Sequence, residues 1–141
     1  MLDTVADDPA SLTPAQLRRA YERRLAEVIT SVGVDTVAAE AGLDRTTVAA
    51  LADGESPELT LEQAAAVLAC SGEVRDAETV IAETRDDLLL GMTTGVLDVD
   101  TIAGEIDLDL TGQEVQQALE GRTSMTLEHL AAIHKVIADR N

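Results

Sequence analysis

The sequence predicts an all-α protein made of two tandem helical units, and two observations support this prediction. Apolar residues recur at the three- and four-residue spacing of amphipathic helices, and no segment alternates as a β-strand does. Long segments also occur twice: LDRTTVAALADG (residues 43–54) returns as LTGQEVQQALEG (residues 110–121). Thr36–Glu40 and Thr101–Glu105 form a second such pair. We therefore interpret the chain as an internal duplication whose two copies fold into the same few helices.

The repeat divides the chain into three parts. Residues 1–12 are polar and acidic, and we expect them to form a flexible tail. Residues 13–72 form the first predicted unit, and residues 73–141 form the second. In the second unit the segment Asp107–Asp109 adds length at the turn where the first unit has Gly42. We expect this insertion to alter the angle between the flanking helices.

Capping residues set the predicted helix boundaries. Thr13 with Gln16 and Thr60 with Gln63 have the spacing of a capping box, and Asp44 or a neighbouring threonine is expected to cap a helix between them. The predicted helices cover residues 13–33, 35–41, 44–53 and 60–70 in the first unit, and residues 76–97, 101–106, 111–120 and 126–139 in the second. The apolar side of the helix at 76–97 is expected to consist of Val80, Ile81, Leu88, Leu89, Leu90 and Met92.

Composition limits the kind of protein further. Of 141 residues, 45% are hydrophobic, which excludes global disorder. Tyr21 is the only Phe, Tyr or Trp, so aliphatic side chains must form the core. The formal net charge is −17, from 27 acidic and 10 basic residues. Such a surface stays hydrated and screened in molar salt, which is typical of halophilic proteins. The alternative is an acidic interaction protein of a mesophile.

Residues 36–68 carry a motif: a short helix, a glycine turn and a second short helix. The segment resembles the Cro/repressor-type (XRE-like) DNA-binding helix-turn-helix. The matching positions in the first copy are Ala38, Gly42, Asp44, Val48, Leu51 and Gly54, and those in the second are Ala103, Thr111, Val115, Ala118 and Gly121. The whole chain also resembles an uncharacterised haloarchaeal family known only as a domain of unknown function. Val48 and Val115 are expected to be buried at equivalent positions.

The resemblance implies where DNA would be bound. In helix-turn-helix proteins the second helix lies in the major groove, and its first residues meet base edges. The base-reading candidates are therefore Arg45 and Thr46 in the first copy and Gln113 and Gln117 in the second, since Arg can bind guanine and Gln adenine. The phosphate-contact candidates are Arg18, Arg19, Arg23 and Arg24. For both sets the alternative is an ordinary solvated helix face with local ion pairs.

The distribution of charge along the chain argues against a large DNA-binding surface. Residues 11–50 hold five basic and five acidic residues, whereas residues 51–141 hold 5 basic and 19 acidic ones. Phosphate neutralisation requires a basic surface. Our leading hypothesis is nevertheless a transcriptional regulator that binds double-stranded DNA with two helix-turn-helix units. The alternative is a protein-interaction module that keeps the scaffold and has lost DNA binding. A homodimer is compatible with either.

Other chemistry is sparse. The sequence has no HExxH, no phosphate-binding glycine loop and no GxSxG motif, so we expect no enzymatic activity and no cofactor. His129 and His134 are five residues apart, a spacing that does not place them neatly on one helix face for a metal ion. Neither a secretory signal nor an apolar stretch of membrane-spanning length is evident, so we expect a cytoplasmic protein.

Overall fold

The computed structural model describes residues 2–141, and within these residues it contains helices and no β-strand. Two short 3₁₀ turns, η1 (Leu2–Thr4) and η2 (Pro9–Ser11), precede the α-helices. The α-helices are α1 (Pro14–Val32), α2 (Val34–Ala41), α3 (Arg45–Ala52), α4 (Leu61–Ala69), α5 (Ala77–Thr94), α6 (Val99–Glu105), α7 (Gly112–Glu120) and α8 (Leu127–Asp139). The prediction of an all-α protein is confirmed.

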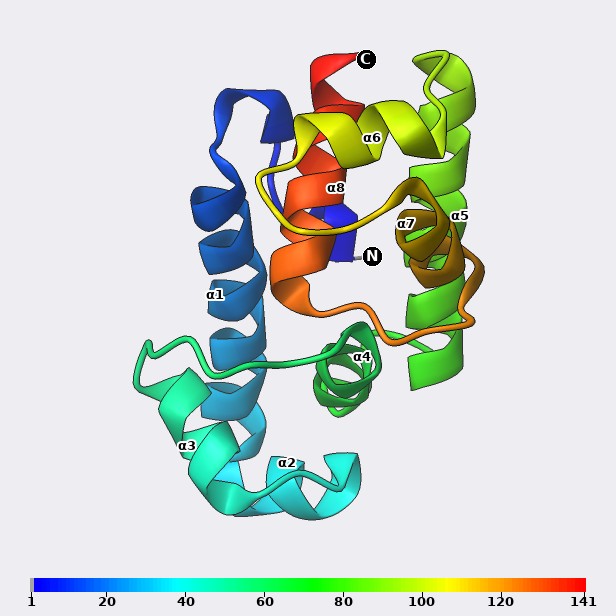
Figure 1. Cartoon of the computed structure of the whole chain (residues 1–141). Coiled ribbons are helices and arrows are strands. Elements are labelled where there is room, and N and C mark those ends of the chain that lie inside the picture. Colours follow the sequence, from blue (N-terminus) through cyan, green and yellow to red (C-terminus); the bar gives the residue numbers. More distant parts are fainter. Residues whose placement is uncertain (1) are drawn as a thin grey trace.

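The two long helices α1 and α5 stand on opposite sides of the molecule, with α4 and α8 between them (Figure 1). Helix α1 packs most extensively against α8, and α4 packs most extensively against α5. Each long helix therefore contacts the last helix of the other half of the chain. The hairpin α2–α3 lies at one end of this arrangement, and α6 lies at the other (Figure 1).

One hydrophobic core runs through both halves. Val48 of α3 and Val115 of α7 are both fully buried, as the repeat predicted. The α1–α8 and α4–α5 contacts join residues 13–72 to residues 73–141. The two predicted units are thus parts of a single packed body, and most of the stability of such short helices comes from this packing.

Local capping explains most of the helix starts. The capping boxes of Thr13 with Gln16 and of Thr60 with Gln63 are both formed. A third box joins Thr111 to Glu114 at the start of α7. Asp44 occupies the predicted N-cap position of α3, but its side chain makes no capping hydrogen bond.

The N-terminal segment also departs from the prediction of a flexible tail. Met1 lies outside the described residues, but Leu2 is fully buried in the core. The turn η1 packs against α5, and η2 packs against α8. Val5, Ala6 and Leu12 of the same segment also pack, partly buried, against the core. These apolar side chains anchor the segment, since burying a leucine alone contributes about 2 kcal/mol.

The expected apolar side of α5 is wrong at two positions. Val80 and Leu88 are buried, whereas Leu89 and Leu90 are exposed. Successive residues of a helix are rotated by about 100°, so three consecutive leucines cannot all face one core.

Candidate functional site

The α2–α3 hairpin has the order of a helix-turn-helix. Helix α2 ends at Gly42, whose φ of +68° lies in the left-handed region. The N–H of Leu43 donates to the carbonyl of Ala38, which completes the turn into α3. Arg45 and Thr46 are the first two residues of α3, and both are exposed. The first two base-reading candidates therefore lie together at the start of the second helix, as the motif requires.

The charge of Arg45 is already neutralised within its own hairpin. Its Nε donates to Oδ1 of Asp35 in α2, at 2.6 Å. Residues 34–54, which span this hairpin, contain four carboxylates and this one arginine. Both side chains of this ion pair are exposed, so Asp35 offsets the positive charge of Arg45 without burying it. The hairpin consequently presents a net negative surface.

The α6–α7 hairpin is more acidic. Its turn, residues 106–111, is longer than the turn of the first hairpin, residues 42–44, as the inserted residues predicted. Gln113 is exposed and makes no side-chain hydrogen bond within the described residues, while Gln117 is half-buried. The segment from residue 98 to residue 121 contains seven carboxylates and neither Lys nor Arg. All seven of these side chains are exposed.

Two arginines of α1 hold the loop between α3 and α4. Arg18 donates to the carbonyls of Ser56 and Pro57, at 3.3 and 3.2 Å. Arg19 donates to the carbonyl of Gly54, at 3.2 Å. The buried Glu22 supports the same loop, since its Oε1 accepts from the hydroxyl of Ser56 at 2.7 Å. Both guanidinium groups therefore have internal partners.

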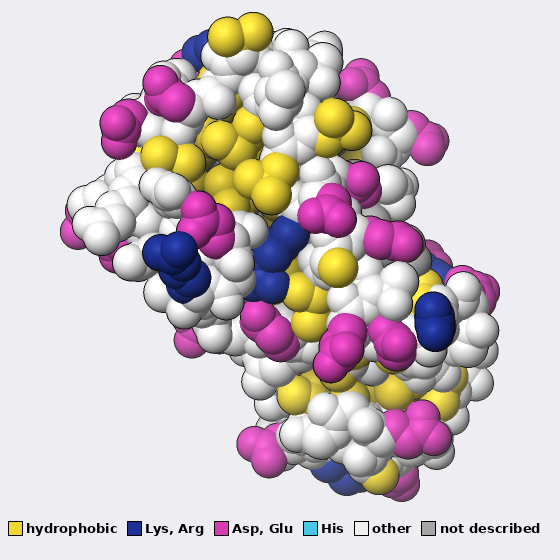
Figure 2. Space-filling model, turned by 90° about the vertical axis from the view of Figure 1, so that its right-hand side faces the viewer, with side chains coloured by type: hydrophobic (Ala, Val, Ile, Leu, Met, Phe, Trp, Pro, Cys, Tyr) yellow, Lys and Arg dark blue, Asp and Glu magenta, His cyan; other side chains and the backbone are white. Residues whose placement is uncertain are grey.

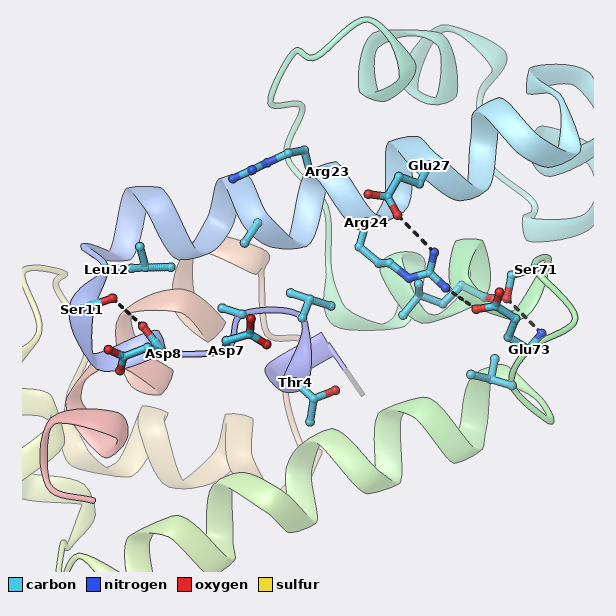
Figure 3. A pocket seen from close by; sticks show the side chains of 15 residues that line it. Thr4, Asp7, Asp8, Ser11, Leu12, Arg23, Arg24, Glu27, Ser71 and Glu73 are labelled. Carbon is cyan, nitrogen blue, oxygen red and sulfur yellow. Dashed lines mark hydrogen bonds and ion pairs between the residues drawn. The ribbon is translucent and has the colours of Figure 1, made fainter.

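The other two arginines line a pocket of about 670 Å³ between the N-terminal segment, α1 and the loop after α4 (Figure 3). Arg24 bridges Glu27 and Glu73, at 3.5 and 2.5 Å. Arg23 is exposed and has no ion-pair partner within the described residues. The charged lining comprises these two arginines and the carboxylates of Asp7, Asp8, Glu27 and Glu73. Four carboxylates against two guanidinium groups do not favour a phosphate.

A buried polar pair that the sequence did not reveal joins α1 to α8. The hydroxyl of Tyr21 lies 2.5 Å from Nδ1 of His134, and the two rings are nearly parallel. Both side chains are buried, and burial lowers the pKa of His134 to about 4. The imidazole is therefore neutral at physiological pH. Its location in the contact between α1 and α8 indicates a structural role.

The described residues contain neither a metal-binding cluster nor a membrane-spanning helix. Among them, no group of three or more His, Cys, Asp or Glu side chains is arranged to hold a metal ion. No helix within residues 2–141 has the length and apolar composition needed to cross a membrane.

These features define an acidic, all-α protein with two helical hairpins packed on one shared core. The chain belongs to the family of unknown function DUF5791, whose model matches residues 17–140. No curated protein and no solved structure matches the chain. The family match agrees with the resemblance to an uncharacterised domain family. The comparisons give no support to the resemblance to Cro/repressor proteins, which stays a hypothesis drawn from the sequence pattern.

Proposed function

We propose that this chain is a non-enzymatic interaction module that binds a positively charged segment of another protein through its α6–α7 hairpin. The observation that supports the proposal is the charge of that hairpin, with seven exposed carboxylates and no cation in residues 98–121. Complementary charge accelerates association with a basic partner and repels acidic ones, nucleic acids included.

Several of these carboxylates are available to a partner. Asp100, Asp107 and Asp109 have no ion-pair partner within the described residues. Glu105 and Glu120 pair instead with Arg140 and Arg122. The free carboxylates lie on α6 and on the turn that follows it, so a lysine- or arginine-rich segment crossing this turn would meet them together.

A lysine-rich peptide of about 12 residues, titrated by calorimetry at about 0.1 M KCl, tests the proposal, because exposed charges are weakly screened at that ionic strength. The variant Asp107→Asn/Asp109→Asn should weaken its binding about fivefold. A matched control is Glu55→Gln/Glu58→Gln in the exposed loop after α3, which removes the same charge elsewhere. Equal weakening by the two variants, or no binding by the wild-type protein, would reject the proposed surface.

A DNA-binding regulator is the second candidate. The observation in its favour is that Thr46 and Gln113 are exposed at the second position of α3 and of α7, without side-chain hydrogen bonds within the described residues. These are positions from which a recognition helix reads bases. The negative charge of both hairpins weighs against this candidate, because non-specific DNA affinity depends on neutralising phosphates.

A further inference from the structure

The C-terminal end of α5 carries an exposed apolar patch, defined by Leu89, Leu90 and Val96. Their exposed fractions are 40%, 65% and 89%, and no other large hydrophobic residue of the described chain is exposed. All three fall within residues 89–96. Figure 2 views the molecule from the side of α5 and shows groups of hydrophobic side chains on this face, bordered by Asp and Glu side chains and by several Lys or Arg side chains.

Close packing on the opposite side of α5 explains why these leucines face outward. A Cβ at Gly91 would lie 2.5 Å from a methyl carbon of Ile137, and one at Gly95 would lie 2.9 Å from Cβ of Arg140. The two glycines, four residues apart, therefore set the face that approaches α8. That orientation places Leu89 and Leu90 on other faces of the helix, where both remain exposed.

Val96 adds a second, independent observation. Its φ of +53° lies in the left-handed region, which is unfavourable for a β-branched side chain. Leu97 donates to the carbonyl of Met92, and Val96 donates to that of Thr93, so Val96 occupies the position after a helix end that normally calls for glycine. The equivalent positions after α2, α3 and α7 are indeed glycines: Gly42, Gly54 and Gly121.

The Val96 side chain is 89% exposed, so burial against the described residues does not offset this backbone strain. Strained backbone conformations persist at sites that serve binding or catalysis, where the side chain itself is needed. A valine in place of glycine costs folding stability here and adds exposed apolar surface just after the end of α5. The side chain is therefore better explained by a contact with another molecule than by the fold.

The charge around the apolar patch indicates the nature of that molecule. Glu83 and Asp86 are exposed on α5, within two turns of Leu90. Arg85 is engaged by Glu62 and by the carbonyl of Ala118. Arg140, beside Gly95, is paired with Glu105. The C-terminal carbonyls of α5 add partial negative charge.

We propose that the apolar patch is the docking site for an amphipathic, cationic segment of a partner protein, with the partner's apolar side chains against Leu89, Leu90 and Val96 and its basic ones over the carboxylates of α5. This inference rests on the proposed function and adds an apolar anchor to it. Amphipathic helices bind in this way, with apolar anchors at helical spacing.

The test uses two synthetic peptides of about 18 residues, long enough for five helical turns. One has leucines along one helical face and lysines along the other, and the second has the same composition in scrambled order. Binding is measured by calorimetry at about 1 M KCl, where the Debye length of about 3 Å leaves the apolar contribution dominant. The protein variants are Leu90→Ser, Val96→Gly and the control Ala39→Ser, an exposed position on α2.

We expect Leu90→Ser and Val96→Gly to weaken binding of the amphipathic peptide about tenfold, and Ala39→Ser to leave it unchanged. Val96→Gly should at the same time raise the folding equilibrium constant about fivefold, because it relieves the backbone strain. If all variants bind the peptide equally, or the scrambled peptide binds as well, the docking site is wrong while the proposed function stands. If neither cationic peptide binds even at about 0.1 M KCl, where charge attraction is weakly screened, both proposals fail.

Discussion

Thr60 and Thr126 face each other in an isolated antiparallel β-bridge at the centre of the molecule. The N–H of Leu61 donates to the carbonyl of Met125 at 2.7 Å, and the N–H of Leu127 donates to that of Leu59 at 2.9 Å. The two donors are 66 residues apart in the sequence, and so are the two acceptors. The two hydrogen bonds are therefore equivalent under the internal repeat. The bridge supplies acceptors to the first N–H groups of α4 and α8, which a helix cannot satisfy by itself. An internal duplication, our interpretation of the sequence repeat, would produce such a reciprocal contact.

The first prediction concerns the caps at this bridge. Thr60 accepts a hydrogen bond from the N–H of Gln63, and Thr126 accepts one from that of His129. Thr60→Ala and Thr126→Ala should each lower the free energy of unfolding by about 1 kcal/mol, the usual value of a lost cap. Urea denaturation measures this change. Thr→Ser at either position retains the oxygen and serves as the control, so an equal loss in the serine variants would contradict the capping role.

The second prediction concerns acid. The pKa of His134 is about 4 in the folded protein and 6.5 in an unfolded chain. Because the folded pKa is the lower one, the unfolded state binds more protons between these values. Stability is therefore fully present above pH 6.5 and is lost as pH falls toward 4, by about 3 kcal/mol in total.

His134→Gln is the matched comparison, because it keeps a polar partner for Tyr21 and removes the titration. The difference in unfolding free energy between wild type and this variant, followed by denaturant titration from pH 7 to pH 4, should change with pH as stated. A difference that does not vary with pH would mean that His134 gains its proton without disturbing the fold.

The third prediction separates the arginines of α1. Arg18→Gln should lower the free energy of unfolding by about 2 kcal/mol, since it removes charge-assisted hydrogen bonds that hold the loop at Ser56 and Pro57. Arg23→Gln, at an exposed position of the same helix without an ion-pair partner in the described chain, should change it by less than about 0.5 kcal/mol. Thermal unfolding of both variants and of the wild-type protein measures these two changes in stability. Equal effects would show that Arg18 does not anchor the loop.

The fourth prediction concerns salt. The 17 excess negative charges repel one another, and screening weakens that repulsion. The melting temperature should therefore rise between about 0.1 M and about 3 M KCl. Glu55→Gln/Glu58→Gln, which removes two exposed charges, should flatten the rise. A melting temperature independent of KCl would count against adaptation to high salt.

Features governed by local chemistry could be predicted from the sequence. The capping boxes at Thr13 and Thr60 depend on residues three apart, and the burial of Val48 and Val115 follows from helical periodicity. The acidity of both hairpins is likewise countable in the sequence. Features that depend on packing between distant segments could not be predicted. Tyr21 and His134 are 113 residues apart, and no local pattern pairs them.

The orientation of α5 is a second feature that depends on packing between distant segments. Periodicity alone left all three leucines at 88–90 as core candidates, and the choice among them depends on how closely Gly91 and Gly95 approach α8. The internal partners of Arg18 and Arg19 depend on the path of the loop after α3, which the sequence does not specify. Because the sequence does not reveal the path of this loop, it leaves the two arginines as candidates for phosphate contact.

We propose that the α6–α7 hairpin presents an acidic surface to a partner protein and that neither hairpin reads the bases of DNA. Titration of fluorescently labelled genomic DNA fragments with the protein, from about 0.1 M to about 3 M KCl, tests this claim most directly. We expect no change in anisotropy at any salt concentration, with Arg45→Ala and Gln113→Ala indistinguishable from wild type. Sequence-specific binding that Arg45→Ala or Gln113→Ala weakens by about 1–3 kcal/mol would contradict it and establish base reading.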